Sequence, residues 1–100
     1  MRYNKLMIVI GWLIWDTHNV AHIARHEVTR QEVEEVCHGN YIIGEANHGR
    51  IMIIGPTQSG RALAAILDSE EEEGIWYPVT ARSADRKERR KYAKEMGVKL

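Results

Sequence analysis

The stretch YIIGEANHGRIMIIG (residues 41–55) contains two apolar runs on either side of a tight turn. The turn is Asn47-His48-Gly49, and its glycine permits the positive φ angle that such turns need. The flanking runs, residues 41–45 and 50–55, have the length and the isoleucine content of strands. The sequence therefore predicts an antiparallel hairpin, against which the other elements are expected to pack.

The sheet is predicted to continue after this hairpin. A turn at residues 56–60 leads into residues 61–67, which are rich in alanine and leucine and would also suit a helix by propensity alone. Because this segment lies between two turns and is followed by the β-rich residues 75–79, a strand in a meander is favoured.

The longest apolar run, residues 6–15, spans ten residues, whereas a membrane-spanning helix needs about 20. Basic residues precede the run as in a signal peptide, but no small-x-small cleavage site follows it directly, which makes secretion the less favoured alternative. Its β-branched and aromatic residues predict a buried strand that ends at a turn near Asp16. No membrane partner is expected.

A first helix is predicted over residues 17–26. Asp16 would cap its N-terminus, and Val20, Ile23 and Ala24 are spaced to form one apolar face.

A second helix is predicted to begin at a capping box formed by Thr29 and Glu32 and to end at Gly39. Its apolar stripe would consist of Val33, Val36 and Cys37. On such a stripe a lone thiol is expected to be a small core residue rather than a nucleophile.

A third helix is predicted over residues 86–96. Asp85 and Glu88 form a second box of the same kind before it, and Gly97 would end it.

These elements predict an α+β fold in a single domain over residues 1–100. It would contain an N-terminal strand and two short helices, an antiparallel sheet of about four strands and a C-terminal helix. One sheet face would be covered, and the other would be left open for a ligand. The lone Cys37 requires no oxidising compartment, so a cytoplasmic location is expected.

The charge is neutral overall but unevenly distributed. Residues 82–94 carry seven basic and two acidic side chains, a net charge of plus five, and residues 68–73 carry five acidic side chains and no basic one. The basic segment suits a localised anionic partner or is a solvated helix face; the acidic one is a solvated loop or a contact for a basic partner.

Three histidines recur every four residues at His18, His22 and His26. The spacing would place them along one side of a helix, as in a metal site, but Asn19 stands where a zinc protease would have its glutamate. A polar helix face, or a role for His26 alone in binding or catalysis, is preferred to a metal site. No cofactor is expected.

Phosphate-binding loops, nucleophile elbows and dinucleotide fingerprints are absent from the sequence. The remaining residues suited to catalysis are arginines, notably Arg50, Arg61 and Arg82. Guanidinium groups grip phosphate and stabilise the extra negative charge of a transition state, as RNA cleavage without a metal requires. His48 and Tyr77 are lesser candidates.

Two motifs then carry a family resemblance. Trp15-Asp16 with Asn19 and Arg25-His26 resembles the W-D-x-x-K-N…K-H start of BrnT-type toxins, and the segment TARSADRKERR (residues 80–90), with Tyr92 after it, is similar to their S-A-R-x-A-T-x-x-E-R-R ending. The resemblance covers about residues 14–94. The departures from the family's pattern are Glu27 for glycine, Thr80 for serine, Asp85 for threonine, an extension of about a dozen residues at the start, and the acidic run of residues 70–73.

The resemblance implies a RelE-like fold and the toxin of a type II toxin–antitoxin system, a ribonuclease that inhibits translation. It also implies a BrnA-like ribbon-helix-helix antitoxin that neutralises the toxin, typically in a heterotetramer.

The working hypothesis is that the 2′-hydroxyl of RNA attacks the adjacent phosphate while His26 or a carboxylate assists proton transfer. Arg82, Arg61 and Arg50 would hold the phosphate. The expected RNA-binding residues are Arg86, Lys87, Arg89 and Arg90. Two alternatives are a non-catalytic module that binds protein or nucleic acid, and a small metalloenzyme built on the three histidines.

Overall fold

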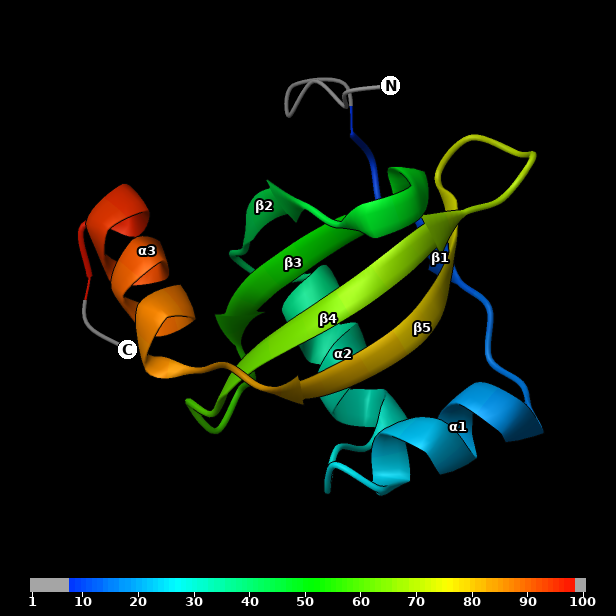
Figure 1. Ribbon diagram of the computed structural model, residues 1–100, viewed down its shortest axis with the longest axis horizontal. Helices are drawn as coiled ribbons and strands as arrows, with labels where there is room; N and C mark the ends of the chain where they lie inside the picture. Colours follow the sequence, from blue (N-terminus) through cyan, green and yellow to red (C-terminus); the bar gives the residue numbers. More distant parts are fainter. Residues whose placement is uncertain (1–7, 99–100) are drawn as a thin grey trace.

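The computed structural model describes residues 8–98. Along this part of the chain the elements are β1 (Trp12–Leu13), α1 (Thr17–Ala24), α2 (Arg30–Cys37), β2 (Ile42–Glu45), the 3-10 turn η2 (Asn47–Gly49), β3 (Ile51–Pro56), β4 (Ala62–Ser69), β5 (Ile75–Ser83) and α3 (Arg86–Met96). The α+β class is therefore confirmed (Figure 1).

The strands form one sheet in the order β1-β5-β4-β3-β2. The predicted hairpin is confirmed as β2 and β3. Of the ambiguous residues 61–67, all but the first belong to β4, which pairs antiparallel with both neighbours. The prediction of an antiparallel sheet of about four strands is corrected in one respect. The short β1 adds a fifth strand that runs parallel to β5, so the sheet is mixed.

The predicted N-terminal strand is much shorter than residues 6–15. Residues 6 and 7 lie outside the described residues, and only Trp12–Leu13 forms a strand. The pairing is held by the N–H of Ile14, which donates to the carbonyl of Trp76 (2.9 Å), and by the Trp76 indole, which donates to the carbonyl of Val9 (2.9 Å).

The two helices α1 and α2 cover one face of the sheet (Figure 1). The main core lies between these helices and the sheet. Its fully buried members include Ile23, Val33, Ile53, Leu63 and Leu67. Cys37 is also buried there, which raises the pKa of its thiol and confirms it as a core residue.

The helix α3 packs on the other face and covers only part of it (Figure 1). Its buried Tyr92 packs with Ile42, Ile54 and Ala64, and its hydroxyl donates to the carbonyl of Asn40 (2.8 Å). The rest of this face is the open face of the sheet predicted from the strand pattern.

The first helix departs from its predicted face and length. Val20 is 39% exposed, Ala24 is exposed, and the helix ends at Ala24 rather than at residue 26. Ile23 is buried as predicted, and the other buried side chain of the helix is Asn19, which donates to the carbonyls of Ile14 (3.0 Å) and Pro78 (3.1 Å). These hydrogen bonds satisfy a buried amide, so a polar residue replaces the expected apolar one.

All three predicted N-terminal caps are confirmed. The side chains of Asp16, Thr29 and Asp85 each accept a hydrogen bond from the backbone N–H three residues later. In each case the side chain of that later residue accepts a hydrogen bond from the backbone N–H of the capping residue. Gly97 ends α3 in the left-handed conformation that glycine favours. Within residues 8–98, no helix combines the length and the apolar content needed to cross a membrane.

Candidate functional site

The open face of the sheet is hollowed into a groove beside α3. Two adjoining cavities of about 440 and 550 Å³ share the side chains of Glu45 and Met52, and together we call them the open-face groove. The first cavity is further lined by Ala46, Asn47, His48, Arg50, Ile66, Val79 and Thr80. The second is further lined by Gly44, Ile54, Asp85, Lys87, Glu88, Arg90, Lys91 and Lys94.

One side of the groove is a row of cations on α3. Lys87, Arg90, Lys91 and Lys94 recur at intervals of three and four residues, which places them along one side of the helix. The row leans over the sheet, because a Cβ built at Gly44 would lie 3.7 Å from the Lys91 Nζ. Within residues 8–98 none of these four cations is held in an ion pair.

The far end of the groove contains Arg50 and His48. The Arg50 Nε lies 3.7 Å from the Asp68 Oδ2. The Arg50 side chain is 35% exposed to solvent and the Asp68 side chain 44% exposed. His48 has a φ of 63°, the left-handed conformation that closes the turn between β2 and β3. Because the exposed Arg50–Asp68 pair is weak, the Arg50 guanidinium is able to contact a ligand.

Arg82 lies on the same face, but it is already paired. Its Nη1 and Nη2 donate to the two carboxylate oxygens of Glu88 at 2.7 and 2.9 Å. This bidentate bond raises the pKa of Arg82 and lowers the pKa of Glu88. Because Glu88 also caps the N-terminus of α3, Arg82 fixes the junction between β5 and that helix.

Arg61 lies on the helix-covered side of the sheet, where its side chain contacts the α1–α2 turn, α2 and the end of β5. It donates to both carboxylate oxygens of Glu32 (3.1 Å each), to the carbonyl of Glu27 (2.6 Å) and to the Ser83 Oγ (3.0 Å). His26 is exposed in the turn after α1, and its carbonyl lies 3.5 Å from the Arg61 Nη2. Arg61 therefore ties the α1–α2 turn to the ends of β4 and β5.

The structure does not gather the four predicted catalytic side chains around one point. Arg82 pairs across the sheet with Ala64 and then Ile54. Ile54 is four residues from Arg50, so the two arginines lie roughly 13 Å apart along the strands and about 10 Å across them. Arg61 lies on the helix-covered side of the sheet, bonded to Glu32. His26 lies in the turn after α1, where its ring contacts that of His22.

The predicted RNA-binding residues divide in the same way. Lys87 and Arg90 line the groove, Arg86 is exposed outside its lining, and Arg89 donates to the carbonyl of Ala84 (2.6 Å). The sequence reading missed Lys91 and Lys94 as individual site residues. Their spacing from Lys87 along one helix side was the signal that could have found them.

The three histidines do not form a cluster. His22 shares a hydrogen bond with the Thr80 Oγ1 (3.0 Å), and its ring meets that of His26 edge to face at 5.6 Å between centroids. The helix α1 ends at Ala24, before His26, but the rings of His22 and His26 remain in contact. In the described part of the chain no group of three histidine, cysteine or acidic residues is placed to hold a metal ion.

Comparison with known proteins yields no match to a family model, to a curated protein or to a solved structure.

Proposed function

We propose that this protein binds and cleaves RNA in the open-face groove, as the toxin of a type II toxin–antitoxin system. The observation that supports the proposal is the row of cations on α3, which have no ion pair within residues 8–98 and face an exposed, partly apolar strip of sheet. Cations without carboxylate partners suit a phosphate backbone, and an open sheet face accommodates unstacked bases.

The proposed reaction needs no metal. The 2′-hydroxyl oxygen of RNA attacks the adjacent phosphorus and gives its proton to a base, while the bond to the 5′-oxygen breaks and an acid protonates that oxygen. The products are a 2′,3′-cyclic phosphate and a 5′-hydroxyl end. Arg50 and His48, which share the first cavity, are the best placed for phosphate binding and proton transfer. Arg82 lies on the same face of the sheet, outside the lining of the groove.

The family-level part of the proposal rests on the sequence resemblance. A RelE-like fold and a BrnA-like ribbon-helix-helix antitoxin follow from the resemblance to BrnT-type toxins carried by the motifs at residues 15–26 and 80–90. The proposed cytoplasmic location rests instead on the lone Cys37, which requires no oxidising compartment. Purification of the protein with the product of the adjacent gene, tested for a stable complex that no longer acts on RNA, examines this part.

A non-catalytic RNA-binding module is the second candidate. It is favoured by the ion pairs of Arg61 and Arg82, which occupy two guanidinium groups that the cleavage hypothesis needs. Both candidates bind RNA in the same groove, so turnover distinguishes them.

The decisive experiment incubates the protein with end-labelled RNA in the presence of a chelator. Fragments that end in 2′,3′-cyclic phosphate, lost in Arg50→Gln and kept in Arg25→Gln, are the expected result. Arg25 is an exposed arginine outside the groove and serves as the matched control. RNA that is bound but left intact, also in a ribosome-containing translation assay, would leave the binding module as the function.

A further inference from the structure

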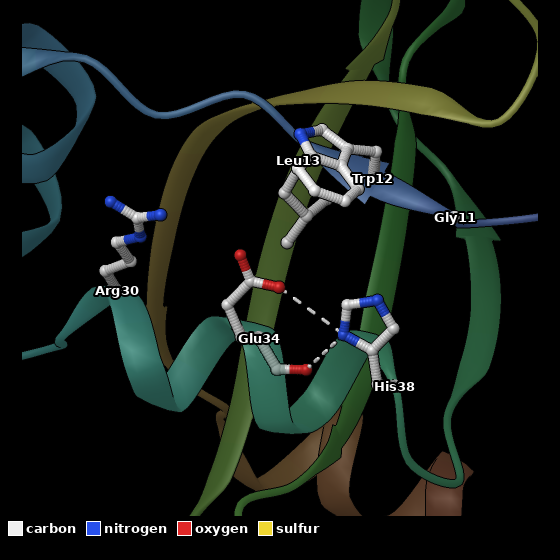
Figure 2. A pocket seen from close by; sticks show the side chains of 6 residues that line it. All are labelled: Gly11, Trp12, Leu13, Arg30, Glu34 and His38. Carbon is white, nitrogen blue, oxygen red and sulfur yellow. Dashed lines mark hydrogen bonds and ion pairs between the residues drawn. The ribbon is translucent and has the colours of Figure 1, made fainter.

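A second pocket lies away from the open-face groove, between β1 and α2 (Figure 2). This β1–α2 pocket has a volume of about 240 Å³ and is lined by Gly11, Trp12, Leu13, Arg30, Glu34 and His38. Trp12 is 69% exposed. An indole left so open to water on a strand contributes little to the core and is suited to stacking with a ligand.

The Glu34 carboxylate in this pocket is already used by the protein. Its Oε2 accepts the indole N–H of Trp15 (2.8 Å), and its Oε1 lies 3.4 Å from the His38 Nδ1. Glu34 therefore positions Trp15 and His38. A cationic ligand would have to compete with both side chains for the Glu34 carboxylate.

The His38 ring is oriented by two oxygen atoms of Glu34. The His38 Nδ1 lies 2.9 Å from the carbonyl oxygen of Glu34 as well as near its carboxylate (Figure 2). Both partners can only accept hydrogen bonds, so Nδ1 carries the proton in the neutral ring. The Nε2 is then an acceptor that faces away from Glu34 and is available to an N–H or O–H group of a ligand.

The cation of the pocket is Arg30. Its guanidinium lies 5.8 Å from the centre of the Trp15 ring and, within residues 8–98, is in no ion pair. Stacking on the indole holds the guanidinium in place while leaving its N–H groups for an anion.

We propose that the β1–α2 pocket binds a nucleotide, with its base stacked on Trp12 and its phosphate held by Arg30. The exposed Trp12 indole suits an aromatic base. The Arg30 guanidinium, which has no ion pair among the described residues, suits a phosphate, and the His38 acceptor suits a polar N–H group. The volume is below the roughly 300 to 1,000 Å³ of pockets for drug-sized ligands, which restricts the site to a single nucleotide. That nucleotide is either free or part of an RNA strand.

The test is calorimetric titration of the full chain with adenosine 5′-monophosphate, adenosine and inorganic phosphate. The monophosphate is expected to bind more tightly than either of its parts. Trp12→Leu is expected to weaken its binding about 5- to 150-fold, the range for loss of one base–aromatic stack. Arg30→Gln is expected to abolish the preference for the monophosphate over adenosine, and Arg25→Gln, an exposed arginine outside the pocket, to change neither.

Repeating the titration with a five-residue oligoadenylate distinguishes the two sources of the nucleotide. Tighter binding of the oligonucleotide, weakened by Trp12→Leu, assigns the pocket to RNA, and equal or weaker binding assigns it to free nucleotide. Absence of saturable binding by the monophosphate and the oligonucleotide alike would overturn the proposal. So would equal affinity for inorganic phosphate, or binding that Trp12→Leu and Arg30→Gln leave unchanged. None of these outcomes bears on RNA cleavage in the open-face groove, which is tested separately with Arg50→Gln.

Discussion

Two sets of cations carry the same charge but have different surroundings. One set is Arg61 and Arg82, at the junctions between the sheet and the helices, and the other is the row along α3. Arg61 and Arg82 each hold a carboxylate with two hydrogen bonds and also contact backbone carbonyls. Lys91 and Lys94 project over an exposed groove without an ion pair among the described residues. The cations that stabilise the fold are therefore different residues from the cations that are available to a partner.

The largest expected effect comes from removing the most connected arginine. Arg61→Ala is expected to lower the free energy of unfolding by about 2 to 3 kcal/mol, because it leaves Glu32 without its charged partner and releases the turn at Glu27. For a domain of this size that is a fall of about 10 to 20 °C in Tm, measured by thermal unfolding.

Arg61→Lys is the matched variant. It is expected to recover little stability, since an ammonium group lacks the planar fork that reaches both Glu32 oxygens and Ser83. Full recovery would mean that charge alone, rather than the bonding geometry, is responsible for the effect.

Arg82→Ala is expected to have a smaller effect that depends on pH. At pH 7 it should cost about 1 kcal/mol, because the Arg82 side chain is 42% exposed and solvent weakens the pair. The bond from Arg82 lowers the pKa of Glu88 below its ordinary 4.5. The contribution of the pair is therefore present above that value and is lost as the pH falls through the lower folded value.

The measurement is urea unfolding of both proteins between pH 7 and pH 2. Wild type and Arg82→Ala should converge in stability at the acid end, where Glu88 is protonated. The specific activity of the folded fraction separates structure from catalysis: if Arg82→Ala destabilises the protein but its folded fraction cleaves RNA as well as wild type, Arg82 has no catalytic role.

The parts of the fold that could be predicted from sequence are those set by local interactions. Asp16, Thr29 and Asp85 cap helices within three residues of chain, and Gly49 and Gly97 fit the left-handed positions that glycine favours. The local pattern therefore decided the helix starts and the hairpin.

The missed features depend on contacts distant in sequence. Asn19 is buried because of a carbonyl at Pro78, and β1 becomes a strand through its pairing with β5. The role of Arg61 could not be predicted for the same reason. Arg61 meets Glu32 across 29 residues, and nothing in the spacing distinguishes that paired arginine from the more exposed Arg50.

The smallest effect on stability is expected in the groove, where the effect on RNA binding should be clear. Lys91→Gln combined with Lys94→Gln should change the free energy of unfolding by no more than about 0.5 kcal/mol, because both side chains are exposed. Each lost phosphate contact should reduce the slope of log affinity against log salt by about 0.7 for single-stranded RNA, so the double variant should lose up to about 1.4. The slope is measured by titrating labelled RNA at several salt concentrations, with Arg25→Gln as the control. An unchanged slope would place the RNA elsewhere and remove the functional difference between the two sets of cations.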